Sequence, residues 1–272
     1  MSRAEDILKY IKKNNSSTAR KFDEHFGDRV EEFCQSIAPI FEGLDNAMIG
    51  NVGEPPIADH IFQGAQLVWG GLNSLIAAME ILRNGHWKDA GIVARSALET
   101  SCCGLHMSQD IAMFDKFRHG EAEYSAAVSF ASKLSRTIPR TYGLLSELFT
   151  HVSQLHGVLH FDRTTGLGMF PAFREQDKHR YASSLLALEM TASDIEQIFE
   201  FIFFKNLPSS KHWQKDTSGK LQWHPNPTIG DKFMRRLIES QVLVKQSLGG
   251  SYEMQLPPKE ILERLGYSHL IA

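Results

Sequence analysis

The chain has 272 residues, of which 42% are hydrophobic and 22% are charged, with a formal net charge of −3. These values are ordinary for a globular protein with a hydrophobic core. The charge argues against a protein held on nucleic acid by bulk electrostatics. Three cysteines form no disulfide framework and the N-terminus lacks a signal-peptide core, so we expect a cytoplasmic compartment.

Apolar residues recur at helical spacing through nearly the whole chain, and alternating strand patterns are scarce. We therefore predict an all-α fold, a multi-helix bundle. Pro39 predicts a kink or an early end of the second helix. The predicted helices span residues 3–13, 18–44, 57–83, 87–107, 108–134, 140–157, 174–205, 229–246 and 258–266.

The third predicted helix is unusually rich in glycine. Gly64, Gly70 and Gly71 each cost roughly 1 kcal/mol of helix stability relative to alanine, and close approach of a neighbouring helix would offset that cost. Asn84-Gly85 ends the helix, and the next helix returns antiparallel. Residues 57–107 are thus predicted to form a long central αα-hairpin. Polar residues interrupt its apolar stretch, so we expect a buried helix and no membrane span.

The composition changes after residue 205. We predict a helical bundle over residues 1–205 and a small, mostly helical C-terminal appendage over 206–272. The appendage starts with a polar, turn-rich linker whose two tryptophans imply that it packs down. A helix, a short strand at 249–256 and a final short helix complete it.

Polar residues on the helix at 87–107 lie on one narrow line: Lys88, Arg95, Glu99 and His106 fall within about 40° at 100° per residue. One interpretation is a solvent-facing stripe with an Arg95–Glu99 ion pair. The other interpretation is that the helix is mostly buried, because the polar stripe is narrow and a surface helix normally shows a wider polar face. Arg95 and Glu99 would then be partly buried and would need partners from other helices.

The helix predicted over 140–157 offers such partners. Tyr142, Ser146 and His156 share a side with apolar residues, whereas His151 falls on the opposite side. Ordinary hydrogen bonds to the backbone or between helices are the alternative for Ser146 and His156. The candidate polar interior network consists of Arg95, Glu99, Tyr142, Ser146, His156 and His151.

Several histidines close together, His151, His156 and His160, raise the question of a metal. A di-iron bundle would need Glu-x-x-His pairs, and no histidine of this chain has a glutamate three residues before it. No cysteine pair has zinc-ligand spacing. We therefore predict no metal and no cofactor, and a ferritin-like metalloprotein is disfavoured.

An Arg-x4-His pattern occurs in REQDKH, from Arg174 to His179, where the last long helix of the bundle begins. Arginine and histidine together can supply phosphate binding and general acid–base catalysis for RNA cleavage. In that interpretation Arg174 binds a phosphate and His179 is the general acid or base. The alternative is a charged first helical turn.

The segments GHWKDAGIVARSALETSCCGLHM and TYGLLSELFTHVSQLHG resemble a broad group of bacterial all-helical proteins of unassigned function. That group carries an Arg-x3-Glu on a central helix, matched here by Arg95 and Glu99, and a later Tyr…Ser…His helix, matched by Tyr142, Ser146 and His151. It is distantly similar to the HEPN superfamily of helical bundles. The resemblance implies an intracellular bacterial protein of a defence or toxin–antitoxin type system, and active HEPN members are dimeric, metal-independent ribonucleases.

Two functional hypotheses follow. The first is a non-catalytic interaction, scaffold or ligand-binding module, which we favour because no residue set demands chemistry. The alternative is an HEPN-like metal-independent ribonuclease acting through Arg174 and His179. We also expect a homodimer with a protein partner, no membrane association, and RNA as a partner only under the ribonuclease hypothesis.

Overall fold

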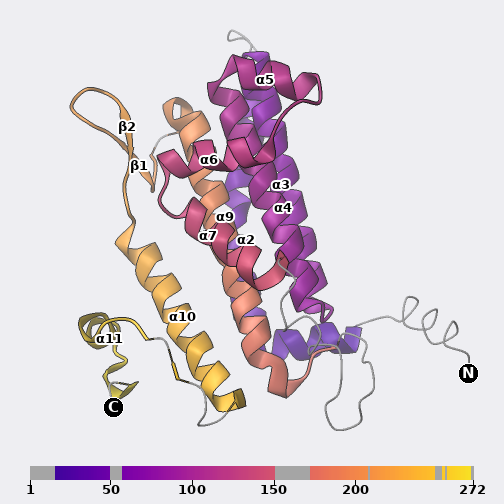
Figure 1. Ribbon diagram of the computed structural model, residues 1–272, viewed down its shortest axis with the longest axis vertical. Helices are drawn as coiled ribbons and strands as arrows, with labels where there is room; N and C mark the ends of the chain where they lie inside the picture. Colours follow the sequence, from indigo (N-terminus) through magenta and orange to yellow (C-terminus); the bar gives the residue numbers. More distant parts are fainter. Residues whose placement is uncertain are drawn as a thin grey trace, which may run out of the picture.

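The predicted all-α fold is confirmed by the structure, a computed structural model in which helices account for nearly all regular structure (Figure 1). The predicted helix over 3–13 lies outside the part of the chain that the structure describes. The described residues are 16–49, 57–150, 172–207, 209–248, 253–254 and 256–270.

Four long helices form the body of the bundle and run along its long axis (Figure 1). They are α2 (Ser16–Ile49), α3 (Asp59–Arg83), α4 (Trp87–Gln109) and α9 (Lys178–Phe203). Three shorter helices cover one side: α5 (Ile111–Arg118), α6 (Tyr124–Leu134) and α7 (Ile138–Leu145). Helix α4 contacts α3, α5, α6, α7 and α9, and α9 contacts α2, α3, α4, α7 and α10, so these two helices form the centre.

Glycines let α3 and α4 approach closely, as the glycines in the interior of the third predicted helix suggested. A Cβ added to Gly64 would lie 2.6 Å from the carbonyl oxygen of Gly104, and one added to Gly71 would lie 2.2 Å from Ser101 Oγ. Gly70 differs, because a Cβ there would meet nothing within 4 Å. The turn between the helices uses Gly85 at φ +97°, a conformation that glycine adopts without strain.

Two predicted boundaries were wrong. The single helix predicted over 108–134 is two helices, because Asp110 caps a new helix by accepting a hydrogen bond from the backbone N–H of Ala112, and Gly120 at φ +75° follows the end of α5. Aspartate is a preferred N-cap residue. Helix α2 continues past Pro39, where an early end was predicted, and past the predicted last residue 44, and it ends at Ile49.

Ion pairs tie α2 to the rest of the bundle. Arg29 of α2 forms a bidentate pair with Glu189 of α9, with N–O distances of 2.9 and 2.8 Å, and both side chains are buried. Arg83, at the end of α3, forms a bidentate pair with Asp23 of α2. Burying Arg29 would be costly without this partner.

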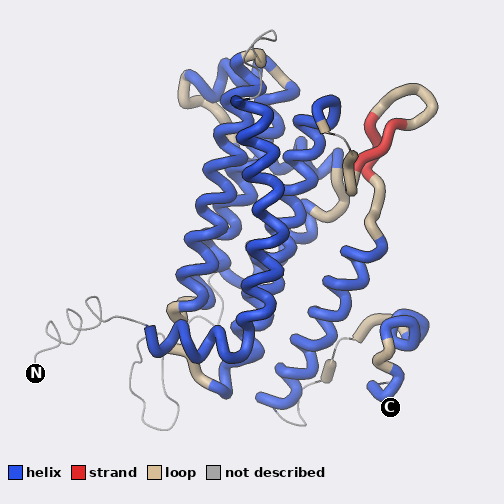
Figure 2. Tube along the Cα trace, turned by 180° about the vertical axis from the view of Figure 1, so that it is seen from behind, coloured by secondary structure: helices blue, strands red, loops and turns tan. Residues whose placement is uncertain are grey.

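The C-terminal segment packs along the outside of α9 (Figure 2). Strands β1 (Trp213–Lys215) and β2 (Leu221–Trp223) form an antiparallel hairpin with Trp213 opposite Trp223. Helix α10 (Pro227–Leu248) lies beside α9 and joins α11 (Lys259–Leu265) in a small core of its own around Ile238. The strand predicted at 249–256 is not seen at 253–254 or 256, and its other residues are not described.

The elements beside these helices are short: π-helical η1 (Ser146–Thr150) and the 3-10 turns η2 (Glu175–Asp177), η3 (Phe204–Asn206) and η5 (Ser268–Leu270). By length and composition alone, α3 is apolar enough to cross a membrane. In the structure it packs against α2, α4 and α9.

Candidate functional site

Arg95, Glu99 and Tyr142 lie together between α4 and α7. Arg95 donates to Glu99 Oε1 at 3.1 Å and to the Tyr142 hydroxyl at 2.6 Å, and that hydroxyl donates to Glu99 Oε1 at 2.9 Å. The side chains of Arg95 and Glu99 are only 22% and 26% exposed. These hydrogen bonds within the triad of Arg95, Glu99 and Tyr142 join the two helices.

The other members of the predicted network do not extend it. The Ser146 hydroxyl donates to the backbone carbonyl of Tyr142 at 2.7 Å, which is the ordinary local bond considered above. His151 and His156 lie outside the described residues. The structure therefore places three of the six residues in one cluster, with Ser146 beside it.

Arg174 and His179 flank the start of α9. Arg174 is extended and precedes η2, while His179 is the second residue of α9, and both side chains are partly exposed. Between them, Glu175 pairs with Lys178 and His25, and these hydrogen bonds lower the pKa of Glu175. Asp177 pairs with Arg180 at 3.2 Å. The charged side chains at the start of α9 thus form several ion pairs with one another and with His25 of α2.

A pocket of about 230 Å³ lies where α7 and α9 meet β2 and the first turn of α10. Its residues come from segments far apart in the sequence. They are Thr137, Arg140, Thr141, Met190, Ser193, Asp194, Gln197, His212, Trp223, Pro225, Asn226, Ile229, Gly230 and Phe233.

Asp194 is the chemically unusual group of this pocket, since it is an acid only 1% exposed. Its Oδ1 accepts hydrogen bonds from the Thr137 hydroxyl at 2.5 Å and from Gln197 Nε2 at 3.2 Å. Its Oδ2 has no hydrogen-bond partner among the described residues. A buried polar atom without a partner costs about 1–3 kcal/mol, so Oδ2 is an acceptor that a donor entering the pocket would satisfy.

The Thr141 hydroxyl is the second unpartnered atom here. It is buried, lines the same pocket and forms no hydrogen bond of good geometry with any described group. A helical threonine usually donates to the carbonyl four residues earlier, which Thr141 does not do. Its hydroxyl lies close enough to the Asp194 carboxyl group for a weak hydrogen bond, of less than ideal geometry, to lower the pKa of that acid.

Burial dominates the acidity of Asp194. Loss of water raises its pKa from 3.8 to about 6, although Thr137, Thr141, His212 and Gln197 each act in the opposite direction. Burial disfavours the charged form of an acid. The Asp194 carboxyl group therefore changes charge close to neutral pH.

A hydrogen-bond network holds the pocket wall together. Gln197 Oε1 accepts from the Ser135 hydroxyl at 2.7 Å and from Trp223 Nε1 at 2.8 Å. Its backbone carbonyl accepts from Trp213 Nε1 at 2.8 Å. Gln197 thus fixes α9, the chain before α7 and both strands of the hairpin around Asp194.

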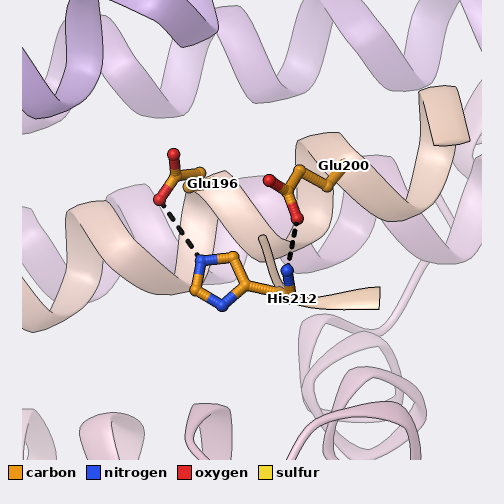
Figure 3. Close-up of side chains that lie close together, drawn as sticks. All are labelled: Glu196, Glu200 and His212. Carbon is orange, nitrogen blue, oxygen red and sulfur yellow. Dashed lines mark hydrogen bonds and ion pairs between the residues drawn. The ribbon is translucent and has the colours of Figure 1, made fainter. Parts of the chain in front are cut away.

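Beside the pocket, Glu196 and Glu200 of α9 face His212 at the start of the hairpin (Figure 3). Their ligand atoms lie within 4.8 Å of one another, close enough to suggest a metal. Every carboxylate oxygen already has a partner, however. Glu200 accepts from Ser210 Oγ and from the backbone N–H groups of Lys211 and His212.

Glu196 completes this clasp between α9 and the hairpin by pairing with the Lys211 ammonium group and with His212 Nε2, the latter at 3.3 Å. Burial raises its pKa, but the bonds from His212 and Lys211 outweigh burial, and the net effect is a lowered pKa. Lys211 already provides the positive charge that a metal would bring. We read the cluster as a structural clasp.

None of Asp194, Thr137, Thr141, Gln197 or His212 was among the residues that the sequence singled out. A weak signal existed, since Asp194 and Gln197 stand among apolar residues of α9, the criterion that drew attention to Tyr142, but other polar residues such as Glu189 and Glu200 share that helix. The pairing with Thr137 and Trp223 could not be read from spacing, because it depends on how distant segments pack.

Compared with known protein families, with curated proteins and with solved structures, the chain matches none of them.

Proposed function

We propose that the protein is a non-catalytic binding module whose helical bundle holds a small ligand in the pocket beside Asp194. The observation that supports this most strongly is that two buried atoms without a hydrogen bond of good geometry, Asp194 Oδ2 and Thr141 Oγ1, belong to residues that line the same pocket. Binding sites typically combine apolar walls with a few convergent polar groups. Met190, Ile229 and Phe233 supply such walls here.

Among the described residues, neither the Asp194 cluster nor the Arg95 cluster places a serine or cysteine nucleophile beside a base, which favours binding over catalysis. A catalytic nucleophile needs a base within hydrogen-bond reach, and Asp194 is held by hydrogen bonds from Thr137 and Gln197. The groups of Arg95, Glu99 and Tyr142 likewise bond to one another. The first arrangement holds a carboxyl group rigidly at the pocket, and the second links two helices of the scaffold.

Affinity selection from a chemically mixed extract of small molecules, read by mass spectrometry, tests this function. Wild-type protein should retain at least one small molecule that the Asp194→Asn variant loses, since the amide removes the negative charge and keeps the shape. Gly230→Phe is a second variant, because Gly230 lies at the pocket and a Cβ there meets nothing within 4 Å, so a ring can block the space. Identical retention by all three proteins would refute the proposal.

A metal-independent ribonuclease is the second proposal. It draws on the partial exposure of Arg174 and His179 together at the start of α9, where an RNA phosphate could reach them. Wild-type protein should then cleave a mixed RNA pool in the presence of a chelator, and His179→Ala should lose that cleavage. Intact RNA at high concentrations of wild-type protein would refute it.

The homodimer and the cytoplasmic location also stand as proposals. Exposed apolar residues on the α3–α4 hairpin, Phe62, Ile76 and Ile92, support an interface there. Light scattering on the purified protein should give twice the chain mass, and a monomer mass would contradict it.

A further inference from the structure

The pocket beside Asp194 is lined by two groups that can carry opposite charges, the Asp194 carboxyl group and the Arg140 guanidinium. Asp194 lies in its interior, 1% exposed. Arg140 lines the same pocket from α7, is exposed, and forms no ion pair with any residue that the structure describes. The pocket therefore combines a buried carboxyl group with a solvent-exposed guanidinium on its positive side.

The first turn of α10 adds to the positive side. Pro225, Asn226, Ile229 and Gly230 line the pocket where this 22-residue helix begins, and the N-terminal end of a helix carries a partial positive charge. Asn226 Oδ1 accepts hydrogen bonds from the backbone N–H groups of Thr228 and Ile229, at 3.1 and 3.3 Å. These groups are already capped, so the helix contributes its field and Arg140 contributes the donors.

The donor that Asp194 Oδ2 lacks is best supplied by a cation. A protein-held carboxylate accepts a charge-assisted bond from an ammonium group more strongly than from a neutral donor. The Thr141 hydroxyl beside it can accept a second ammonium hydrogen, and an ammonium group has three to donate. The interior therefore fits a primary ammonium group.

We infer that the ligand is a small zwitterion of the amino-acid type, with its ammonium group on Asp194 Oδ2 and Thr141 Oγ1 and its carboxylate at Arg140. This inference rests on the proposed function and names its ligand class. The side chain of the ligand would lie against Met190, Ile229 and Phe233. The volume of about 230 Å³ is below the range of about 300–1,000 Å³ for drug-sized ligands, which agrees with a ligand of the size of a single amino acid.

Matched probes separate the contributions of the two charged groups. Leucine, isopentylamine and 4-methylpentanoate share one apolar skeleton, as do phenylalanine, phenethylamine and 3-phenylpropanoate. Binding of each is measured by ligand-observed NMR and by isothermal titration, with wild-type protein, Asp194→Asn and Arg140→Gln. Arg140 is exposed, so its variant should fold normally even if Asp194→Asn proves unstable.

We expect the amino acid of at least one trio to bind more tightly than its amine, and the acid to bind weakest. Asp194→Asn should weaken amino acid and amine alike by about tenfold or more, the effect of losing a charged hydrogen bond. Arg140→Gln should remove the preference for the amino acid over the amine and leave the amine unchanged.

Two results would contradict a zwitterionic ligand without contradicting the proposed binding function of the pocket. One is an amine that binds as tightly as its amino acid, with no effect of Arg140→Gln. The other is a failure of every probe although the extract yields a ligand that depends on Asp194. If the probes fail and the extract also yields nothing, the zwitterion and the proposed binding function fall together.

Discussion

The two carboxyl oxygens of Asp194 lie in different environments. Its Oδ1 accepts hydrogen bonds from Thr137 and Gln197, whereas its Oδ2 has no partner among the described residues. The first arrangement fixes the carboxyl group in place, and the second leaves it able to receive a donor. A buried acid is retained against its desolvation cost only where something offsets that cost, and a bound ligand would do so.

The raised pKa of Asp194 makes a prediction about stability. Because its native pKa is about 6 and its ordinary value is 3.8, the native state keeps the proton between these pH values while the unfolded chain loses it. The stability that this group contributes is therefore complete below pH 3.8 and is lost as pH rises through about 6. Relative to Asp194→Asn, wild-type protein should lose up to about 3 kcal/mol of unfolding free energy across this window.

Urea unfolding of both proteins at a series of pH values measures that difference. The comparison with Asp194→Asn cancels the other carboxyl groups, such as Glu32, whose pKa is lowered by Lys232 and whose contribution runs in the opposite direction. Parallel stability curves for the two proteins would show that Asp194 does not titrate abnormally.

Tyr142 gives a second prediction at the residue scale. Its hydroxyl bridges Arg95 and Glu99, so Tyr142→Phe should cost about 1–2 kcal/mol of unfolding free energy. Tyr124→Phe is a matched control, because Tyr124 is 55% exposed and should tolerate the change. Equal effects of the two substitutions would remove the triad as a link between α4 and α7.

Among the elements, the α3–α4 pair depends on glycines at defined positions. Gly64→Ala should destabilise the protein by about 1–3 kcal/mol, since the new methyl group would meet the backbone carbonyl of Gly104 at 2.6 Å. Gly70→Ala on the same helix should stabilise it by about 0.5–1 kcal/mol, because its Cβ meets nothing and alanine favours the helix. Thermal unfolding distinguishes the two, and the same sign for both would contradict the close packing.

Helices α2 and α9 are joined by the buried pair of Arg29 and Glu189. Glu189→Gln should cost about 3–5 kcal/mol, because it leaves the Arg29 guanidinium buried without a counter-charge. The double variant Arg29→Met with Glu189→Leu should recover most of that loss, since it replaces the pair with apolar groups. Denaturant unfolding measures both, and a double variant as unstable as the single one would show that the pair itself is required.

At the scale of the molecule, the spacing of apolar residues predicted most of the helices. The αα-hairpin at 57–107 and the glycine packing follow from spacing within a single helix, and α10 and α11 were found within two residues of their ends. The split between α5 and α6 was missed because a capping aspartate inside a helical pattern is a weak signal. The hairpin of β1 and β2 was missed because three-residue strands show no alternation.

The pocket could not be predicted because it is a product of packing. Thr137, Asp194 and Trp223 are brought together only when α7, α9 and β2 meet. Sequence identified the line of Arg95 and Glu99 because the pattern lies on one helix. The sequence could not show that Arg95, Glu99 and Tyr142 bond to one another, whereas Asp194 Oδ2 has no hydrogen-bond partner among the described residues.

The central claim is that Asp194 holds a cationic ligand. It is tested most directly by the carbon-13 shift of the Asp194 carboxyl group, followed through a pH titration. Without ligand the signal should titrate near pH 6, as its buried position requires. With a saturating amino acid selected by the binding assays, the midpoint should fall by at least about one unit, because an ammonium group favours the charged carboxylate. An unchanged midpoint with saturating ligand would show that the ligand does not bind at Asp194.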